Sequence, residues 1–349
     1  MEYSLKEIEN KKIWGRCSFE SNDFVMFWTE SGVEFNVKAS YMFAEIEASY
    51  EVLELWLDVF VDDERIMRFP LQQGKHKYQI LRGFDPSHST RVRIARNTQS
   101  MPDDKVSLIK ICSIDTDAEF LAVPDRKYKI EFIGDSITSG EGSAALTREE
   151  WIPTVFDPAL GYVAETAKLL DAEYNMISQS GWGLYASWDG NLEYALPLVY
   201  KYVCGSQKTE YALAAGSCDE WDFESNKKDA IIINLGTNDS GACKLDKFDY
   251  EQFMKDFVEC GVNFLKDVRA KNPDSVIVWC YGMLGTGMQN RIEDIVKAYN
   301  NNSSDNVKFV LLPDCSDGFV GARMHPNPEG HKLAAAELFK CLKEELINE

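Results

Sequence analysis

Four short polar clusters carry the residue types that acyl transfer needs, in residues 134–140, 180–183, 236–239 and 325–331. A serine in a tight turn, here Ser136, can present its hydroxyl as a nucleophile. Histidine is suited to take the serine proton, and His325 is the candidate base. A developing oxyanion needs hydrogen-bond donors. The backbone N–H of Ser136, the backbone N–H of Gly181 and the side-chain amide of Asn238 can supply three of them.

The chain has only four histidines, which narrows the choice of base. His76 and His88 lie in a region that we expect to be all sheet. Asn327 and Pro328 read as the N-cap and the first residue of a helix. His331 then falls in the first turn of that helix, where a packing or surface role is expected. His325 precedes the helix and lies on a loop at the carboxyl side of the last strand, where the other clusters also lie.

The elements around these clusters explain why they should meet. Each cluster follows a predicted strand: 129–133, 175–178, 230–235 and 307–312, and a further strand is expected at 276–279. Helical spacing of apolar residues marks 160–170, 253–268 and 333–346. Strands that alternate with helices predict a parallel α/β sheet. The carboxyl ends of parallel strands share one edge of the sheet, where ligands bind.

The N-terminal third shows a different pattern. Apolar residues alternate over 53–61, which indicates a half-buried strand, and a polar turn at 62–64 leads to a return strand at 66–69. Other short strands are expected at 24–28, 33–37, 92–94 and 106–111. Many short strands with turn signals predict an all-β sandwich of jelly-roll type. We therefore expect two domains, a β-sandwich at 1–124 and an α/β domain at 125–349.

Composition limits the partners. Lys and Arg total 37 against 57 Asp and Glu, a formal net charge of -20, which disfavours nucleic acid and anionic membranes and suits a neutral substrate. No apolar run approaches the roughly 18 residues of a membrane span. Residues 1–10 show no leader pattern, so a cytoplasmic location is expected, or secretion if a leader once preceded them. Nine cysteines without a CxxC pair indicate free thiols, and neither a metal nor a cofactor is expected.

The four clusters resemble the four sequence blocks of SGNH (GDSL-like) hydrolases. The preceding sandwich, the Ser-Gly-Trp-Gly segment at 180–183 and the 281–285 stretch are similar to carbohydrate esterase family 2. The resemblance implies a three-layer, flavodoxin-like parallel sheet after a jelly-roll domain. It also implies Ser136 as nucleophile, His325 as base, and Ser136, Gly181 and Asn238 as the oxyanion hole. The implied activity removes O-acetyl groups from xylan- or mannan-type sugars, with an acetylated oligosaccharide or polysaccharide as substrate.

One departure from the SGNH pattern concerns the third catalytic member. Most of these enzymes place an aspartate two or three residues before the histidine, where this chain has Arg323 and Ala322. We expect a Ser–His dyad in which a main-chain carbonyl accepts the Nδ1 proton and fixes the useful tautomer. Asp314 or Asp317 folding back toward the histidine stays open as the alternative.

Two tryptophans near the clusters are candidates for substrate contact. Trp182 lies between two glycines of a site loop, and Trp279 lies in a predicted buried strand, where packing is the simpler role. Two other functions fit the same residues: an SGNH esterase acting on lipids or thioesters, and a carbohydrate-binding protein without catalysis. The sequence also leaves the oligomeric state open.

Overall fold

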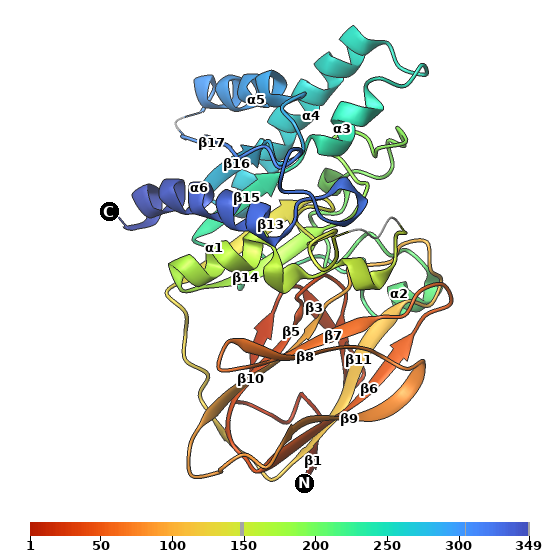
Figure 1. Ribbon diagram of the computed structural model, residues 1–349, viewed down its shortest axis with the longest axis vertical. Helices are drawn as coiled ribbons and strands as arrows, with labels where there is room; N and C mark the ends of the chain where they lie inside the picture. The colour runs from red at the N-terminus through yellow and green to blue at the C-terminus, as the bar shows by residue number, and fades with distance from the viewer. Residues whose placement is uncertain (147–149, 304, 348–349) are drawn as a thin grey trace. The chain divides into compact units, whose positions relative to one another are not determined.

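A computed structural model describes residues 1–146, 150–303 and 305–347, and these fall into two compact units (Figure 1). The first unit comprises Met1–Asp125 together with Lys201–Trp221, and the second comprises Arg126–Tyr200 and Asp222–Glu349. The sequence pattern did not indicate that residues 201–221 leave the α/β unit. Side chains of the first unit bind them: the Trp28 indole N–H donates to the Val203 carbonyl, and Arg16 donates to the Tyr202 carbonyl, both at 2.8 Å.

Two antiparallel sheets build the first unit. One has the order β3 (Cys17–Glu20), β4 (Asp23–Met26), β11 (Leu108–Thr116), β6 (Tyr41–Ser49) and β9 (Gly74–Arg82), and β1 (Glu2–Tyr3) also pairs with β11. The other has the order β12 (Glu119–Leu121), β5 (Gly32–Lys38), β10 (Thr90–Arg96), β7 (Trp56–Val61) and β8 (Glu64–Pro70), and β2 (Lys12–Trp14) also pairs with β5. A short helix, α2 (Glu210–Ala214), lies in the 201–221 segment. The predicted all-β sandwich is confirmed.

Strand β6 shows how the sandwich forms its core. Its residues alternate between buried and half-buried, with Met42, Ala44, Ile46 and Ala48 on the buried face. Such alternation follows from the two-residue period of a strand with one face toward the core. The strand predicted at 53–61 from apolar alternation is, however, longer than the observed β7. Leu53 and Leu55 precede the strand, which begins only at Trp56.

The second unit contains a five-stranded parallel sheet. Its order is β14 (Ala172–Ser178), β13 (Tyr128–Gly134), β15 (Ala230–Asn234), β16 (Val276–Tyr281) and β17 (Lys308–Leu311). The register pairs Gly134 with Ser178 on one side and with Asn234 on the other. Strands β14, β13 and β15 therefore end level with one another. The loops that follow them emerge at the same edge of the sheet, as predicted.

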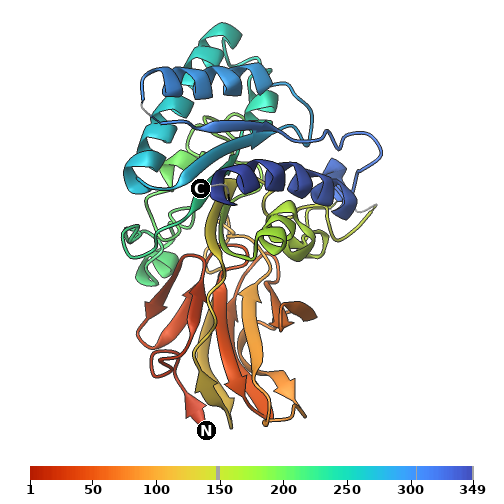
Figure 2. The ribbon, with the colours of Figure 1, turned by 90° about the vertical axis from the view of Figure 1, so that its left-hand side faces the viewer.

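Helices cover both faces of this sheet (Figure 2). The chain steps from β13 to one neighbour through α1 (Tyr162–Leu170), and from β15 outward on the other side through α3 (Thr237–Ala242), α4 (Tyr250–Lys271) and α5 (Gln289–Asn301). Right-handed crossovers in opposite directions place these helices on opposite faces. Helix α6 (Pro328–Ile347) packs against α1, and α4 packs against α5. The predicted three-layer α/β architecture is confirmed.

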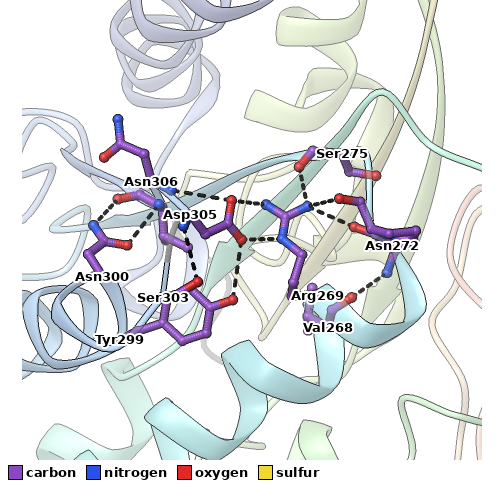
Figure 3. Close-up of polar contacts among 11 residues, drawn as sticks. Val268, Arg269, Asn272, Ser275, Tyr299, Asn300, Ser303, Asp305 and Asn306 are labelled. Atoms are coloured by element: carbon purple, nitrogen blue, oxygen red, sulfur yellow. Dashed lines mark hydrogen bonds and ion pairs between the residues drawn. The ribbon is translucent and has the colours of Figure 1, made fainter.

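The guanidinium of Arg269, near the end of α4, makes hydrogen bonds to three segments of this unit (Figure 3). Arg269 Nη1 donates to the carbonyl oxygens of Asn272, Pro273 and Ser275 at 2.8, 3.0 and 2.7 Å. Nε and Nη2 of Arg269 donate to the two carboxylate oxygens of Asp305. The side chains of Arg269 and Asp305 are only 20% and 24% exposed. The contacts therefore join the end of α4 to the start of β16 and to the segment before β17.

We predict that Arg269→Met lowers the free energy of unfolding by about 2–4 kcal/mol, because three carbonyls and a half-buried carboxylate lose the hydrogen bonds that Arg269 donates. Urea denaturation followed by circular dichroism measures the change. Arg291→Met is the matched control: its ion pair with Asp294 is exposed, so a change below about 0.5 kcal/mol is expected. An Arg269 variant as stable as this control would contradict the prediction.

Candidate active site

The nucleophile candidate lies in a tight turn directly after β13. The backbone N–H groups of Ser139 and Glu141 donate to the carbonyls of Asp135 and Ser136, both at 3.0 Å. The turn passes so close to the strand that a Cβ on Gly134 would lie 2.0 Å from Thr138 Oγ1. Ser136 is 6% exposed. The turn thus fixes the serine at the carboxyl edge of the sheet.

The structure brings His325 against this serine although 189 positions separate them. His325 Nε2 lies 2.7 Å from Ser136 Oγ. His325 Nδ1 lies 2.8 Å from the main-chain carbonyl of Arg323. A carbonyl can only accept, so Nδ1 carries the proton and Nε2 keeps its lone pair for the serine hydroxyl. This is the tautomer that a general base requires.

The loop that carries His325 packs directly on the nucleophile turn. The Ala322 N–H donates to the Gly142 carbonyl at 3.1 Å, and the Gly321 N–H donates to the His325 carbonyl at 2.6 Å. Gly142 has φ +83°, and a Cβ there would lie 2.5 Å from the Cβ of His325. Glycine is therefore required at position 142 by its backbone conformation and by the approach of the base.

The three predicted oxyanion donors lie shortly after the ends of β13, β14 and β15. Within the described part of the chain, neither the Ser136 N–H nor the Gly181 N–H donates to another residue, so both are available to an oxyanion. The Asn238 amide nitrogen lies 2.8 Å from the Trp182 carbonyl and 3.4 Å from Asp135 Oδ2. Asn238 therefore links the loop that holds Gly181 to the turn that holds Ser136.

Two buried aspartates that were not predicted as site residues support these loops. The carboxylate of Asp239 accepts hydrogen bonds from the backbone N–H groups of Leu184, Tyr185 and Ala186 at 2.8–2.9 Å. Burial raises the pKa of Asp239 to about 6. Asp135 accepts from the Ile137 N–H at 3.0 Å, and burial raises its pKa to about 7. Both directly adjoin predicted site residues in sequence, which was the available signal.

A third unpredicted carboxylate lies close to the base. Glu141 is 2% exposed, and its Oε1 accepts from Arg323 Nε at 2.7 Å. Its Oε2 accepts from the Ser180 hydroxyl at 2.7 Å and lies 3.9 Å from His325 Nε2. Spacing could not reveal this contact, because it depends on how the loop of His325 docks. Asp314 and Asp317, the alternatives left open by the sequence, are both exposed, and so is Glu329, which follows the base by four residues.

The predicted substrate-binding tryptophans lie inside the unit. Trp182 is 5% exposed and its ring stacks on Tyr194, with ring centroids 5.2 Å apart. Trp279 is fully buried and donates from its indole N–H to the Leu235 carbonyl at 3.2 Å. The structure thus favours packing for both. Trp188 is instead 66% exposed, and a Cβ on Gly181 would lie 2.9 Å from its Cδ1. An open indole face therefore borders the oxyanion loop.

His331 occupies the packing position expected from sequence. It is fully buried, its ring stacks parallel to that of Tyr162, and its Nδ1 accepts from the Tyr162 N–H at 3.1 Å. Within the described residues its Nε2 has no hydrogen-bond partner. Burial, with a smaller contribution from the charge of His325, lowers the pKa of His331 to about 3. His331 is therefore neutral in the native state at ordinary pH.

Because His331 is buried in its neutral form, we predict that the free energy of unfolding decreases in acid. Between the unfolded pKa near 6.5 and the native value of about 3, the unfolded state binds a proton that the native state does not. As the pH is lowered through this range, the free energy of unfolding should therefore decrease by about 1.4 kcal/mol per pH unit from this residue alone. His331→Phe keeps the stacking but cannot titrate, so wild type should lose about 3 kcal/mol relative to it between pH 6.5 and 4. Urea titrations at several pH values measure this.

The control for this experiment is His88→Phe at an exposed position, which should keep the wild-type slope. Parallel pH curves for wild type and His331→Phe would contradict the assignment.

The described residues contain no group of three or more His, Cys, Asp or Glu side chains arranged to hold a metal ion. In the same residues, no helix combines the length and the apolar character needed to cross a membrane.

Comparisons with known proteins find likeness over the whole chain. A sequence profile of the GDSL-like Lipase/Acylhydrolase family matches residues 132–333. The chain is 29% identical over 346 residues to Cellulase/esterase CelE of Acetivibrio thermocellus, covering 95% of this chain but only 39% of CelE. It therefore spans well under half the length of that relative.

Solved structures match more completely. An acetyl xylan esterase (Est2A) from the rumen bacterium Butyrivibrio proteoclasticus superposes with a TM-score of 0.94 at 33% identity, covering 99% of this chain and 98% of the other. A family two carbohydrate esterase from Clostridium thermocellum, in complex with cellohexaose, gives a TM-score of 0.83 at 25% identity, covering 96% and 99%.

Proposed function

Because the chain belongs to the GDSL-like lipase/acylhydrolase family, we propose that it is a serine esterase that removes O-acetyl groups from plant-polysaccharide sugars. The observation that carries the proposal is the 2.7 Å contact between Ser136 Oγ and His325 Nε2. The similar proteins named acetyl xylan esterase and family two carbohydrate esterase support a sugar ester as substrate. Acetylated xylo-, manno- or gluco-oligosaccharides are the proposed class.

The proposed reaction has two acyl transfers. Ser136 Oγ attacks the acetyl carbonyl while His325 Nε2 takes the hydroxyl proton. The N–H groups of Ser136 and Gly181 stabilise the oxyanion. The amide of Asn238 joins them by giving up its longer contact, at 3.4 Å, with Asp135 Oδ2. His325 then returns the proton to the leaving sugar hydroxyl, which departs and leaves an acetylated serine. Water, activated by the same histidine, attacks this ester and releases acetate and free Ser136.

The exposed ring of Trp188 suits a sugar substrate. The C–H face of a pyranose packs on a flat indole, and this ring lies next to Gly181, whose N–H is a proposed oxyanion donor. A sugar resting on Trp188 would present its ester near the serine turn. The net charge of -20 also suits a neutral saccharide better than an anionic one.

An acyl-chain series tests the proposal against a lipid or thioester hydrolase. With 4-nitrophenyl acetate, butyrate and octanoate, we expect kcat/KM to fall at least about tenfold from acetate to butyrate and further to octanoate, because a site that binds an acetyl group must accommodate each added methylene. A rise toward octanoate would instead indicate a lipid esterase. No turnover of any ester would indicate binding without catalysis. Acetylated oligosaccharides with the released position mapped by NMR then identify the sugar and the hydroxyl.

The proposed dyad makes a separate prediction about carboxylates. Asp314→Asn, Asp317→Asn and Glu329→Gln should each leave kcat within about threefold of wild type, since exposed charges contribute little and His325 Nδ1 already donates to a carbonyl. In a triad, replacing the aspartate by asparagine lowers kcat by about ten-thousand-fold. Steady-state kinetics on the purified variants measures this. A loss of that size in any one of them would replace the dyad with a triad.

A further inference from the structure

Arg323, whose carbonyl holds the base, has an unusual backbone conformation. It has φ 54° and ψ 35°, and Met324 after it has φ 59°. Side chains with a Cβ rarely occupy this left-handed region, so surrounding contacts must hold such residues there. This conformation directs the Arg323 carbonyl toward His325 Nδ1, which lies 2.8 Å away.

The side chain of Arg323 is anchored by the buried carboxylate of Glu141. Arg323 Nε donates to Glu141 Oε1 at 2.7 Å, and the glutamate side chain is 2% exposed. Glu141 is itself fixed to the nucleophile turn, because its backbone N–H donates to the Ser136 carbonyl at 3.0 Å. The Ser180 hydroxyl holds the other carboxylate oxygen at 2.7 Å. One side chain thus joins the turn of the nucleophile to the loop of the base.

The same carboxylate lies on the side of His325 where the proton arrives. Glu141 Oε2 is 3.9 Å from His325 Nε2, the atom that would take the proton from Ser136 Oγ. The Nδ1 side of the ring faces a neutral carbonyl, which orients the ring but does not match the charge of an imidazolium. A carboxylate in a buried site interacts with that charge more strongly than it would in water.

We propose that Glu141 is a positioning residue for the base. Its carboxylate fixes the left-handed turn at Arg323, which aims the carbonyl at Nδ1, and it balances the positive charge that His325 gains in the transition state. The inference rests on the esterase reaction proposed above. It explains how a site without an aspartate near the histidine still holds a charge beside the imidazole.

Two substitutions separate charge from shape at this position. Glu141→Gln has the same size and can still accept from Arg323, but it removes the charge. Glu141→Asp keeps the charge on a shorter side chain. We expect Glu141→Gln to lower kcat on 4-nitrophenyl acetate by about 10–100-fold with KM within about threefold, because only the transition state carries the imidazolium. Glu141→Asp should retain a higher kcat than Glu141→Gln. A purely structural role predicts the reverse order.

Controls distinguish failure of this inference from failure of the proposed function. Glu329→Gln removes an exposed charge four residues after the base and should stay within about threefold of wild type. Ser136→Ala, assayed in parallel, tests the esterase reaction itself, and an active Ser136→Ala variant would overturn the proposed function first. If Ser136→Ala is inactive, two results overturn only the role of Glu141. One is a kcat of Glu141→Gln within threefold of wild type, and the other is a higher kcat for Glu141→Gln than for Glu141→Asp.

A second site keeps the test decisive if Glu141→Gln does not fold, which circular dichroism and a urea midpoint would show. Arg323→Met leaves Glu141 in place but removes the anchor of the turn. We expect it to lower kcat at least about tenfold, since a small displacement of a catalytic group is costly. A wild-type kcat in a folded Arg323→Met variant overturns the proposal.

Discussion

Replacing Ser136 with alanine is expected to lower kcat at least about a thousand-fold while the protein stays folded. The substitution removes the oxygen that lies 2.7 Å from His325 Nε2, and no other hydroxyl of the turn is placed against that nitrogen by the contacts described. Since Ser136 makes its turn through backbone groups, the fold does not depend on its side chain. Kinetics with an activated acetate ester measures the loss.

His325→Ala should reduce kcat to a similar level, and the double variant should lose little more, because nucleophile and base act as a unit. Mass spectrometry gives a second measurement: 4-nitrophenyl acetate, quenched with acid during turnover, should leave an acetyl group on wild-type enzyme and none on Ser136→Ala. Near-normal turnover in a folded Ser136 variant, or losses that multiply in the double variant, would count against the assignment.

The second large effect is expected from a single methyl group at Gly142. A Cβ at this position would lie 2.5 Å from the Cβ of His325 and 2.6 Å from the Ala322 carbonyl oxygen. Gly142→Ala must therefore displace the loop of the base away from Ser136. A shift of about 1 Å in a catalytic group can cost about a hundred-fold in rate, and we expect at least this loss in kcat.

Gly318→Ala is the matched control for this substitution. Gly318 has φ +82°, close to the +83° of Gly142, but a Cβ there would meet nothing within 4 Å. Both variants bear the strain of a left-handed alanine, and only Gly142→Ala disturbs the base. We expect Gly318→Ala to keep kcat within about threefold, since its cost falls on stability alone. Equal kcat values for the two variants would show that the close approach does not matter.

Local patterns were enough to predict much of this protein. Parallel strands such as β15 could be recognised because they are continuously buried and end in polar clusters, and the sandwich because its strands alternate. The strand predicted at 307–312 is present as β17, but it is only partly buried. The family, the class of carboxylic ester hydrolase and the fold are confirmed. The role of each site residue stays a prediction, although the contact of Ser136 with His325 supports it.

Features set by long-range docking were not predicted from the sequence. Glu141 carries no motif of its own, and its contact with Arg323 depends on two loops that meet in space. Aromatic residues near the clusters could not be sorted into packed and open ones. Trp182 and Trp188 are six positions apart, yet only the second is exposed, because the stacking of Trp182 on Tyr194 is a tertiary contact.

The segment Lys201–Trp221 has a consequence for the modularity of the gene. It is inserted between β14 and β15 of the α/β unit but groups with the sandwich, where Trp28 and Arg16 hold it. A recombination break near residue 125 would therefore join the α/β unit, which still contains residues 201–221, to a new N-terminal domain. The residues of the sandwich that bind this segment would be lost. The two units are interleaved in the coding sequence and can be exchanged as modules only through three breakpoints. Selection should then keep them together as one inherited block.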